Sequence, residues 1–346
     1  MNSKAFGSFT KEHETPSKAF FFALYCFIQH CGNSRNYCCP FHIYSNMNMS
    51  VNKKNKLIVF AAVLFSVTMV CFPRVTEVGS KSAIIIWANS IVPVLLPFFI
   101  FSDFIKRTGN LEKLPPRVYP FLVAFLSGYP MGAKVTSDLV TERSLSAETG
   151  RHMLSYSLVT GPAFIMGTVG GFLGSTEAAA AVALAHYGGA LLNGMLWKQG
   201  DDRINDLSKH AAHKGSLLDG FSGSILAGFK AMAIILAYLM FFMIGINLME
   251  EAGLFLLIRS ETAVSVLKGM LEMTAGSSMV GACNISLPMK TVLISFLVSF
   301  GGLSVIGQSA SMAGGSGIGI ADIFKIKVTH GLLAGILAVI LSSFML

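Results

Sequence analysis

The apolar and polar positions divide this chain into long hydrophobic runs separated by short polar connections. Each run is close to the roughly 20 residues that an α-helix needs to cross the hydrocarbon core of a bilayer. The pattern therefore predicts an all-α polytopic membrane protein with at least five crossings. The longest runs cover residues 57–72, 83–104, 178–197, 225–249 and 328–346.

Composition and charge agree with a membrane location. Hydrophobic residues make up 53% of the chain and charged residues only 13%, whereas a soluble domain carries about 25% charged residues. The net charge of +8 comes from basic residues scattered through short loops. This distribution is typical of the positive-inside rule, so we expect the lipid bilayer to be a partner and expect no nucleic acid.

The N-terminal residues 1–48 differ in character from the rest of the chain. They are mixed in polarity and contain four of the six cysteines. We interpret them as an extension unrelated to the membrane region and expect translation to begin at Met47 or Met49, because a short basic segment and the first span follow there. That first span and its connection are assigned to residues 49–82.

Two halves of the chain match each other at an offset of about 140 to 145 residues. The match predicts a first repeat at 83–200, a polar cytoplasmic loop at 201–220 and a second repeat at 221–346. The charges of the connecting loops give the two repeats opposite orientations, as in many secondary transporters. The paired positions are Ser155 with Ser295, Gly161 with Gly301, Gly167 with Gly307, and His186 with His330.

The stretch FLSGYPMGAKVTSDL, residues 125–139, interrupts the first repeat. Gly128, Pro130 and Gly132 fall within five residues of this stretch and predict a helix break, because proline lacks a backbone donor and glycine loosens the turn. Broken helices at membrane depth line a cavity or are buried in protein. Lys134 and Asp138 lie four residues apart, so they could pair with each other or snorkel at the membrane interface. The alternative is that Lys134 attracts an anion at the helix start.

The matching place in the second repeat is GMLEMTAGSS, residues 269–278, where Glu272 precedes Thr274. Glu272 is the only acidic residue between Glu261 and Asp322. An isolated intramembrane carboxylate is a functional candidate. It could carry a coupling proton, coordinate a cation, pair with a lysine of the other half, or simply be a wetted helix end.

Further breaks occur at Thr160-Gly161-Pro162 and at Gly301-Gly302, and the second is followed by Gln308 and Ser309. Two half-helices that meet near the midplane expose backbone groups to a solute, although close packing through small residues is the alternative. For His186 and His330 the sequence favours hydrogen bonds between helices over proton transport.

No enzyme is predicted, because the chain contains no HExxH, GxSxG, GxxxxGK or CxxC motif. We expect no metal and no cofactor beyond a coupling ion. Whether that ion is a proton or sodium is open.

Several segments in this order resemble the YlbJ-type sporulation integral membrane proteins of endospore-forming bacteria, from about residue 53 to residue 346. The resemblance implies a nucleoside recognition or gate domain present twice, as two inverted repeats with re-entrant hairpins and broken helices, as in concentrative nucleoside transporters. It also implies a role in spore maturation, in the cell membrane or outer forespore membrane, moving dipicolinate from the mother cell toward the forespore. The segments are FLSGYPMGAKVTSDL, LVTGPAFIMGTVGGFLG, LAHYGGALLNG, GMLEMTAG, SFGGLSVIGQSASM and THGLLAGIL.

The leading hypothesis is thus a transporter of a small anion, with dipicolinate as the favoured substrate. One alternative is a nucleoside-type transporter, in which Thr160, Glu272 and Gln308 bind a neutral solute. Another is a scaffold that does not transport and recruits other sporulation membrane proteins; a homo-oligomer is also open. The predicted substrate-binding residues are Ser127, Gly128, Tyr129, Pro130, Lys134, Thr160, Gly161, Pro162, Glu272, Thr274, Gln308 and Ser309.

Overall fold

A computed structural model describes residues 53–107, 115, 117–141, 145–200 and 217–346. The predictions for residues 1–48 and for most of the polar loop lie outside these residues. The described residues contain helices and no strand, which confirms the all-α prediction. The chain divides into two compact units, Met1–Thr76 and Glu77–Leu346.

The described part of the first unit contains α2 (Lys53–Cys71) and the start of α3 (Pro73–Ile86). The apolar part of α2, Lys56–Cys71, is shorter than the five spans found among the described residues. Four of those spans coincide with the longest predicted runs, and the fifth, Leu287–Met312, lies in the second predicted repeat. The five are Pro73–Ile105, Thr176–Leu196, Leu217–Glu251, Leu287–Met312 and Ile320–Met345.

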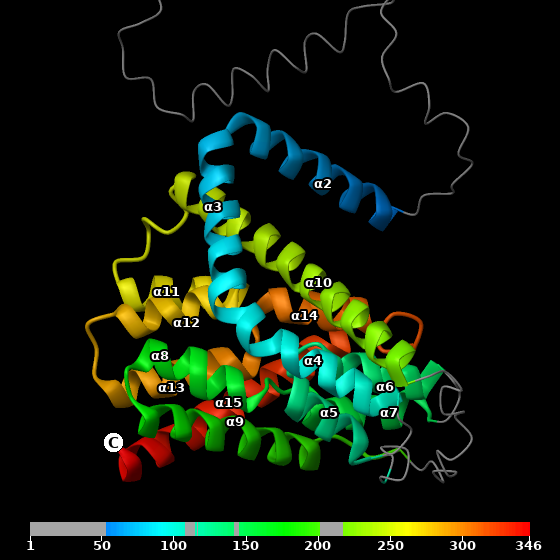
Figure 1. Ribbon diagram of the computed structural model, residues 1–346. Coiled ribbons are helices and arrows are strands. Elements are labelled where there is room, and N and C mark those ends of the chain that lie inside the picture. Colours follow the sequence, from blue (N-terminus) through cyan, green and yellow to red (C-terminus); the bar gives the residue numbers. More distant parts are fainter. Residues whose placement is uncertain (1–52, 108–114, 116, 142–144, 201–216) are drawn as a thin grey trace, which may run out of the picture. The chain divides into compact units, whose positions relative to one another are not determined.

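In the second unit α3 continues into two further helical segments, and a long helix packs along the last of them (Figure 1). The Trp87 indole donates a hydrogen bond to the Met232 carbonyl over 3.0 Å, which links the chain just before the last of these segments to the long helix. The segments are the π-helical turn η2 (Trp87–Ile91), α4 (Val92–Arg107) and the long helix α10 (Leu217–Glu251).

The first predicted break is confirmed as the tip of a helical hairpin, α5 (Tyr119–Ser127) and α6 (Met131–Thr141). Gly128 ends α5 with a φ of 76°, a conformation that glycine adopts without strain. A Cβ atom on Gly128 would also lie 2.9 Å from the backbone nitrogen of Gly161. The first break therefore packs directly against the break at Gly161.

The Gly161 break follows α7 (Ala147–Ser157), whose start is capped by Ser146: its Oγ accepts from the Thr149 N–H over 3.2 Å. Residues 158–161, which belong to neither a helix nor a strand, separate α7 from the next helical turns. These are η4 (Phe164–Val169), another π-helical segment, then α8 (Gly170–Leu173) and α9 (Thr176–Leu196).

The second half repeats this order of hairpin and broken helix. Helices α11 and α12 form a hairpin that breaks at Glu272, whereas α13 and α14 are separated by Gly301 and Gly302, with φ values of 82° and 70°. The elements are α11 (Glu261–Leu271), α12 (Met273–Ala282), α13 (Leu287–Phe300), α14 (Gly302–Met312) and α15 (Ile320–Met345).

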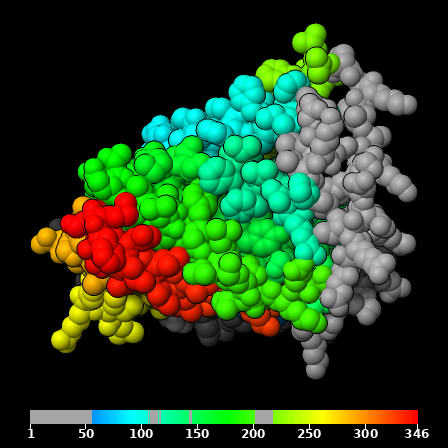
Figure 2. All heavy atoms as spheres, turned by 90° about the horizontal axis from the view of Figure 1, so that it is seen from below, coloured from blue at the N-terminus to red at the C-terminus, as the bar shows by residue number. Residues whose placement is uncertain are grey.

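Helices α9 and α15 lie side by side, as Figure 2 shows for the green and red segments, and α13 packs against both. The outward faces of α9 and α15 expose large apolar side chains, an arrangement suited to lipid rather than water. With the five spans, this face makes the chain a multi-pass integral membrane protein. The exposed side chains include Leu184, Leu192, Leu332, Ile336 and Val339.

Candidate functional site

The chain breaks of both halves meet at one small, partly open cavity in the second unit. Its volume is about 40 Å³, enough for a few water molecules. Leaving aside the sulfur of Met273, five polar side chains line the cavity, and all five belong to the residues predicted from sequence: Tyr129, Thr160, Glu272, Thr274 and Gln308. The apolar lining consists of Ile91, Leu95, Phe164, Ile235, Leu239, Met273 and Val305.

Glu272 is buried, with 3% of its surface exposed, so it is not the wetted helix end that the sequence left open. Its Oε2 accepts a hydrogen bond from the Ala275 N–H over 2.7 Å, which makes the carboxylate the N-cap of α12. Ser304 Oγ lies 3.5 Å from Oε1. The carboxylate therefore satisfies a helix start and faces the cavity at the same time.

The Thr160 break is held by side chains of α9. The Thr160 N–H donates to His186 Nε2 over 3.0 Å, and the Tyr187 hydroxyl donates to the Thr160 carbonyl over 2.9 Å. With Nε2 accepting, Nδ1 carries the proton, and it lies 2.8 Å from Ser299 Oγ. His330 Nε2 in turn lies 2.9 Å from the His186 carbonyl, which confirms hydrogen bonds between helices for both histidines.

The remaining predicted residues at the breaks lie behind the lining. The hydroxyls of Ser127 and Ser309 are buried and have no hydrogen-bond partner within the described part of the chain. Gly128, Pro130, Gly161 and Pro162 shape the two adjoining breaks without lining the cavity.

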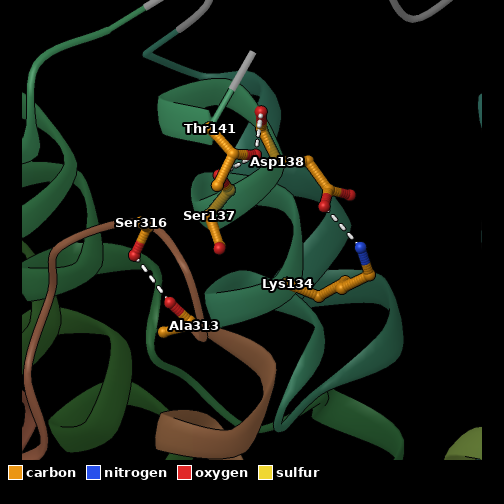
Figure 3. Close-up of polar contacts among 6 residues, drawn as sticks. All are labelled: Lys134, Ser137, Asp138, Thr141, Ala313 and Ser316. Atoms are coloured by element: carbon orange, nitrogen blue, oxygen red, sulfur yellow. Dashed lines mark hydrogen bonds and ion pairs between the residues drawn. The ribbon is translucent and has the colours of Figure 1, made fainter. Parts of the chain in front are cut away.

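Lys134 is not brought to the cavity. Its ammonium pairs with the Asp138 carboxylate one turn along α6, and 45% of its side chain is exposed (Figure 3). This is the pairing that the four-residue spacing allowed. Anion binding by Lys134 stays a prediction.

Lys327 is the residue that sequence reasoning missed. The last predicted apolar run begins one residue later, at 328, whereas the structure places Lys327 inside α15 with 0% of its surface exposed. Its ammonium donates to the Tyr129 hydroxyl and to the Leu158 carbonyl, the latter over 3.0 Å, and lies 4.3 Å from the centre of the Tyr129 ring. A signal was present, because Lys327 falls on the helical stripe of Ile323, Ile326, His330, Ala334 and Ala338, which is buried.

Along 85% of its length the chain is similar to the sporulation integral membrane protein YlbJ of Bacillus subtilis (strain 168), with 24% identity over 343 residues that cover 84% of that protein. This match confirms the YlbJ-type resemblance. No family model and no solved structure matches the chain. The YlbJ-type resemblance therefore rests on sequence, while the gate domain stays a prediction.

Proposed function

We propose that this protein is a sporulation membrane transporter that moves a small anion, with dipicolinate as the favoured substrate, from the mother cell toward the forespore. The observation that carries the proposal is the convergence of breaks from both halves on one small cavity with five polar lining side chains. The name of the Bacillus subtilis relative supports the link to sporulation.

The inverted repeat predicted from the sequence is typical of transport by alternating access, in which one half rocks against the other around a central site. His186 and His330 are 144 residues apart and their rings lie 4.8 Å from each other. Equivalent residues meet in this way next to a two-fold axis. Breaks of helices at the two repeats' interface are the usual place for a solute site.

The cavity must enlarge before a solute the size of dipicolinate can enter, because about 40 Å³ holds only water. A cavity of this size fits a state in which the solute site is contracted. We propose that Glu272, the one carboxylate in the lining, acts in coupling through a proton or a sodium ion. Its negative charge makes it unsuited to contact a substrate carboxylate directly.

The test is dipicolinate entry into vesicles that contain the purified full-length protein and trapped terbium(III), which luminesces when dipicolinate chelates it. We expect entry only with the protein present. Met273→Trp should block entry by filling the cavity, whereas Met279→Trp, on the exposed side of the same helix, should not. No entry with the wild-type protein would overturn the proposal.

A nucleoside-type transporter is the second candidate. It is favoured by the cavity lining itself, in which Thr160, Thr274 and Gln308 offer neutral hydrogen-bonding groups and no cation occurs. Uptake of uridine without uptake of dipicolinate would support this alternative. Uptake of neither solute would favour the scaffold.

A further inference from the structure

Lys327 is a basic group held inside the fold, with 0% of its surface exposed. Among the described residues no carboxylate lies within 4.0 Å of its ammonium, whereas Lys134 and Lys268 each have one. An ammonium buried in a membrane protein is expensive to retain, and such groups usually pair with an opposite charge. The partners here are a hydroxyl and a carbonyl, both neutral.

A glycine next to Lys327 leaves room for its side chain. A Cβ atom on Gly301 would lie 3.3 Å from Lys327 Cε, so the glycine leaves space for the lysine stem. The Leu158 carbonyl that accepts from the ammonium belongs to the residue after the end of α7, where helix carbonyls favour a cation. Lys327 thus lies at the junction of two chain breaks.

The Tyr129 hydroxyl connects this charge to the cavity. Tyr129 lines the cavity, accepts from Lys327 and donates to the Val298 carbonyl over 3.2 Å. An ammonium has three N–H donors, and two of them have acceptors in the described part of the chain. The third donor has no acceptor there, and Lys327 does not itself line the cavity, so an acceptor from the cavity would meet the ammonium at the Tyr129 contact.

We propose that Lys327 is the cation that recognises a carboxylate of the substrate. Before the substrate binds, the Tyr129 hydroxyl occupies the place on the ammonium that this carboxylate takes. A carboxylate replaces the hydroxyl as acceptor because its negative charge adds Coulomb attraction to the ammonium, which a neutral hydroxyl does not offer. Tyr129 then swings away from the ammonium as the cavity enlarges. This assignment rests on the proposed transport of an anion.

The experiment measures the dissociation constants, Kd, of dipicolinate and of its neutral isostere pyridine-2,6-dicarboxamide for full-length protein in lipid nanodiscs. Lys327→Met should weaken dipicolinate binding by roughly tenfold to hundredfold and leave the dicarboxamide affinity unchanged. Lys325→Met is the matched control, since Lys325 is exposed on the same helix, and should alter neither value. Tyr129→Phe should tighten dipicolinate binding, because it removes the hydroxyl that competes for the ammonium.

The outcomes separate this inference from the proposed function. If the wild-type protein binds no dipicolinate, the proposed function fails and the inference fails with it. If the wild type binds dipicolinate and Lys327→Met binds it equally well, only the inference is overturned. Should Lys327→Met not fold, Tyr129→Phe decides alone, and weaker dipicolinate binding in that variant would mark a purely structural pair and overturn the inference.

Discussion

The hairpins α5–α6 and α11–α12 interrupt the membrane helices at corresponding places with different chemistry. The first breaks at Gly128, whose positive φ ends α5, and Pro130. The second needs no glycine at its tip, because Glu272 has an extended conformation and caps α12 with its own carboxylate. The first tip is therefore bonded by groups of other helices, through Tyr129, whereas at the second tip the carboxylate of Glu272 bonds the start of its own helix.

This difference shows that a charge near a break is not automatically a ligand. Glu272 is partly used as a helix cap, and Lys134 is drawn along α6 toward Asp138. The charge that reaches the first tip comes instead from Lys327, 198 residues from Tyr129 in the sequence. What completes a break is decided by the helices packed around it.

The largest effect is expected where the second hairpin packs against itself. A Cβ atom on Gly276 would overlap the Cα atom of Gly269 in the facing helix, and backbone cannot move aside as a side chain can. Gly276→Ala should therefore lower the free energy of unfolding by about 3 kcal/mol or more, measured by thermal unfolding in detergent.

The control for this change is Gly167→Ala, because nothing lies within 4 Å of a Cβ atom at that position. It should leave the stability unchanged or slightly raise it, since alanine favours helix. Equal unfolding temperatures for the two variants would show that the hairpin does not depend on close backbone contact.

An intermediate effect is expected at the tip of the same hairpin. Glu272→Ala removes the cap of α12 and should cost about 1 to 2 kcal/mol of stability, whereas Glu272→Gln keeps an oxygen for the Ala275 N–H and should cost less. The Gln variant also tests coupling in vesicles. Loss of accumulation against a gradient with exchange intact would assign coupling to Glu272, and unaltered accumulation would exclude that role.

The smallest effect is expected on the outside of the first hairpin. The Lys134–Asp138 pair is partly exposed, and such pairs contribute at most about 1 kcal/mol. Lys134→Ala should change both stability and dipicolinate uptake little, because recognition is assigned to Lys327. A strong loss of uptake that Lys134→Ala with Asp138→Ala does not rescue would return recognition to Lys134.

Much of the fold and the cavity could be predicted because breaks are encoded by local residue types. Gly128, Pro130 and the isolated Glu272 mark the two tips, and the tips locate Tyr129 and Thr274. Four of the five spans follow from apolar length alone. Local patterns suffice wherever the backbone itself must change direction.

Lys327 could not be assigned in the same way. A lysine just before an apolar run resembles a loop charge, and its burial arises only when α15 packs against α9 and α13. For Lys134 the sequence allowed both an ion pair with Asp138 and the binding of an anion at the helix start. Spacing along one helix does not decide between them, because the choice depends on neighbouring helices.

The central claim is that the cavity between the hairpins is the path of the solute. Substrate protection tests it most directly, with Thr274→Cys introduced into a variant whose six native cysteines are serine. A thiol reagent should modify Thr274→Cys more slowly when dipicolinate is present, and modification of Ser278→Cys, on the exposed side of α12, should be unaffected. The claim is contradicted if the Thr274→Cys variant transports dipicolinate and its thiol reacts at the same rate with and without dipicolinate.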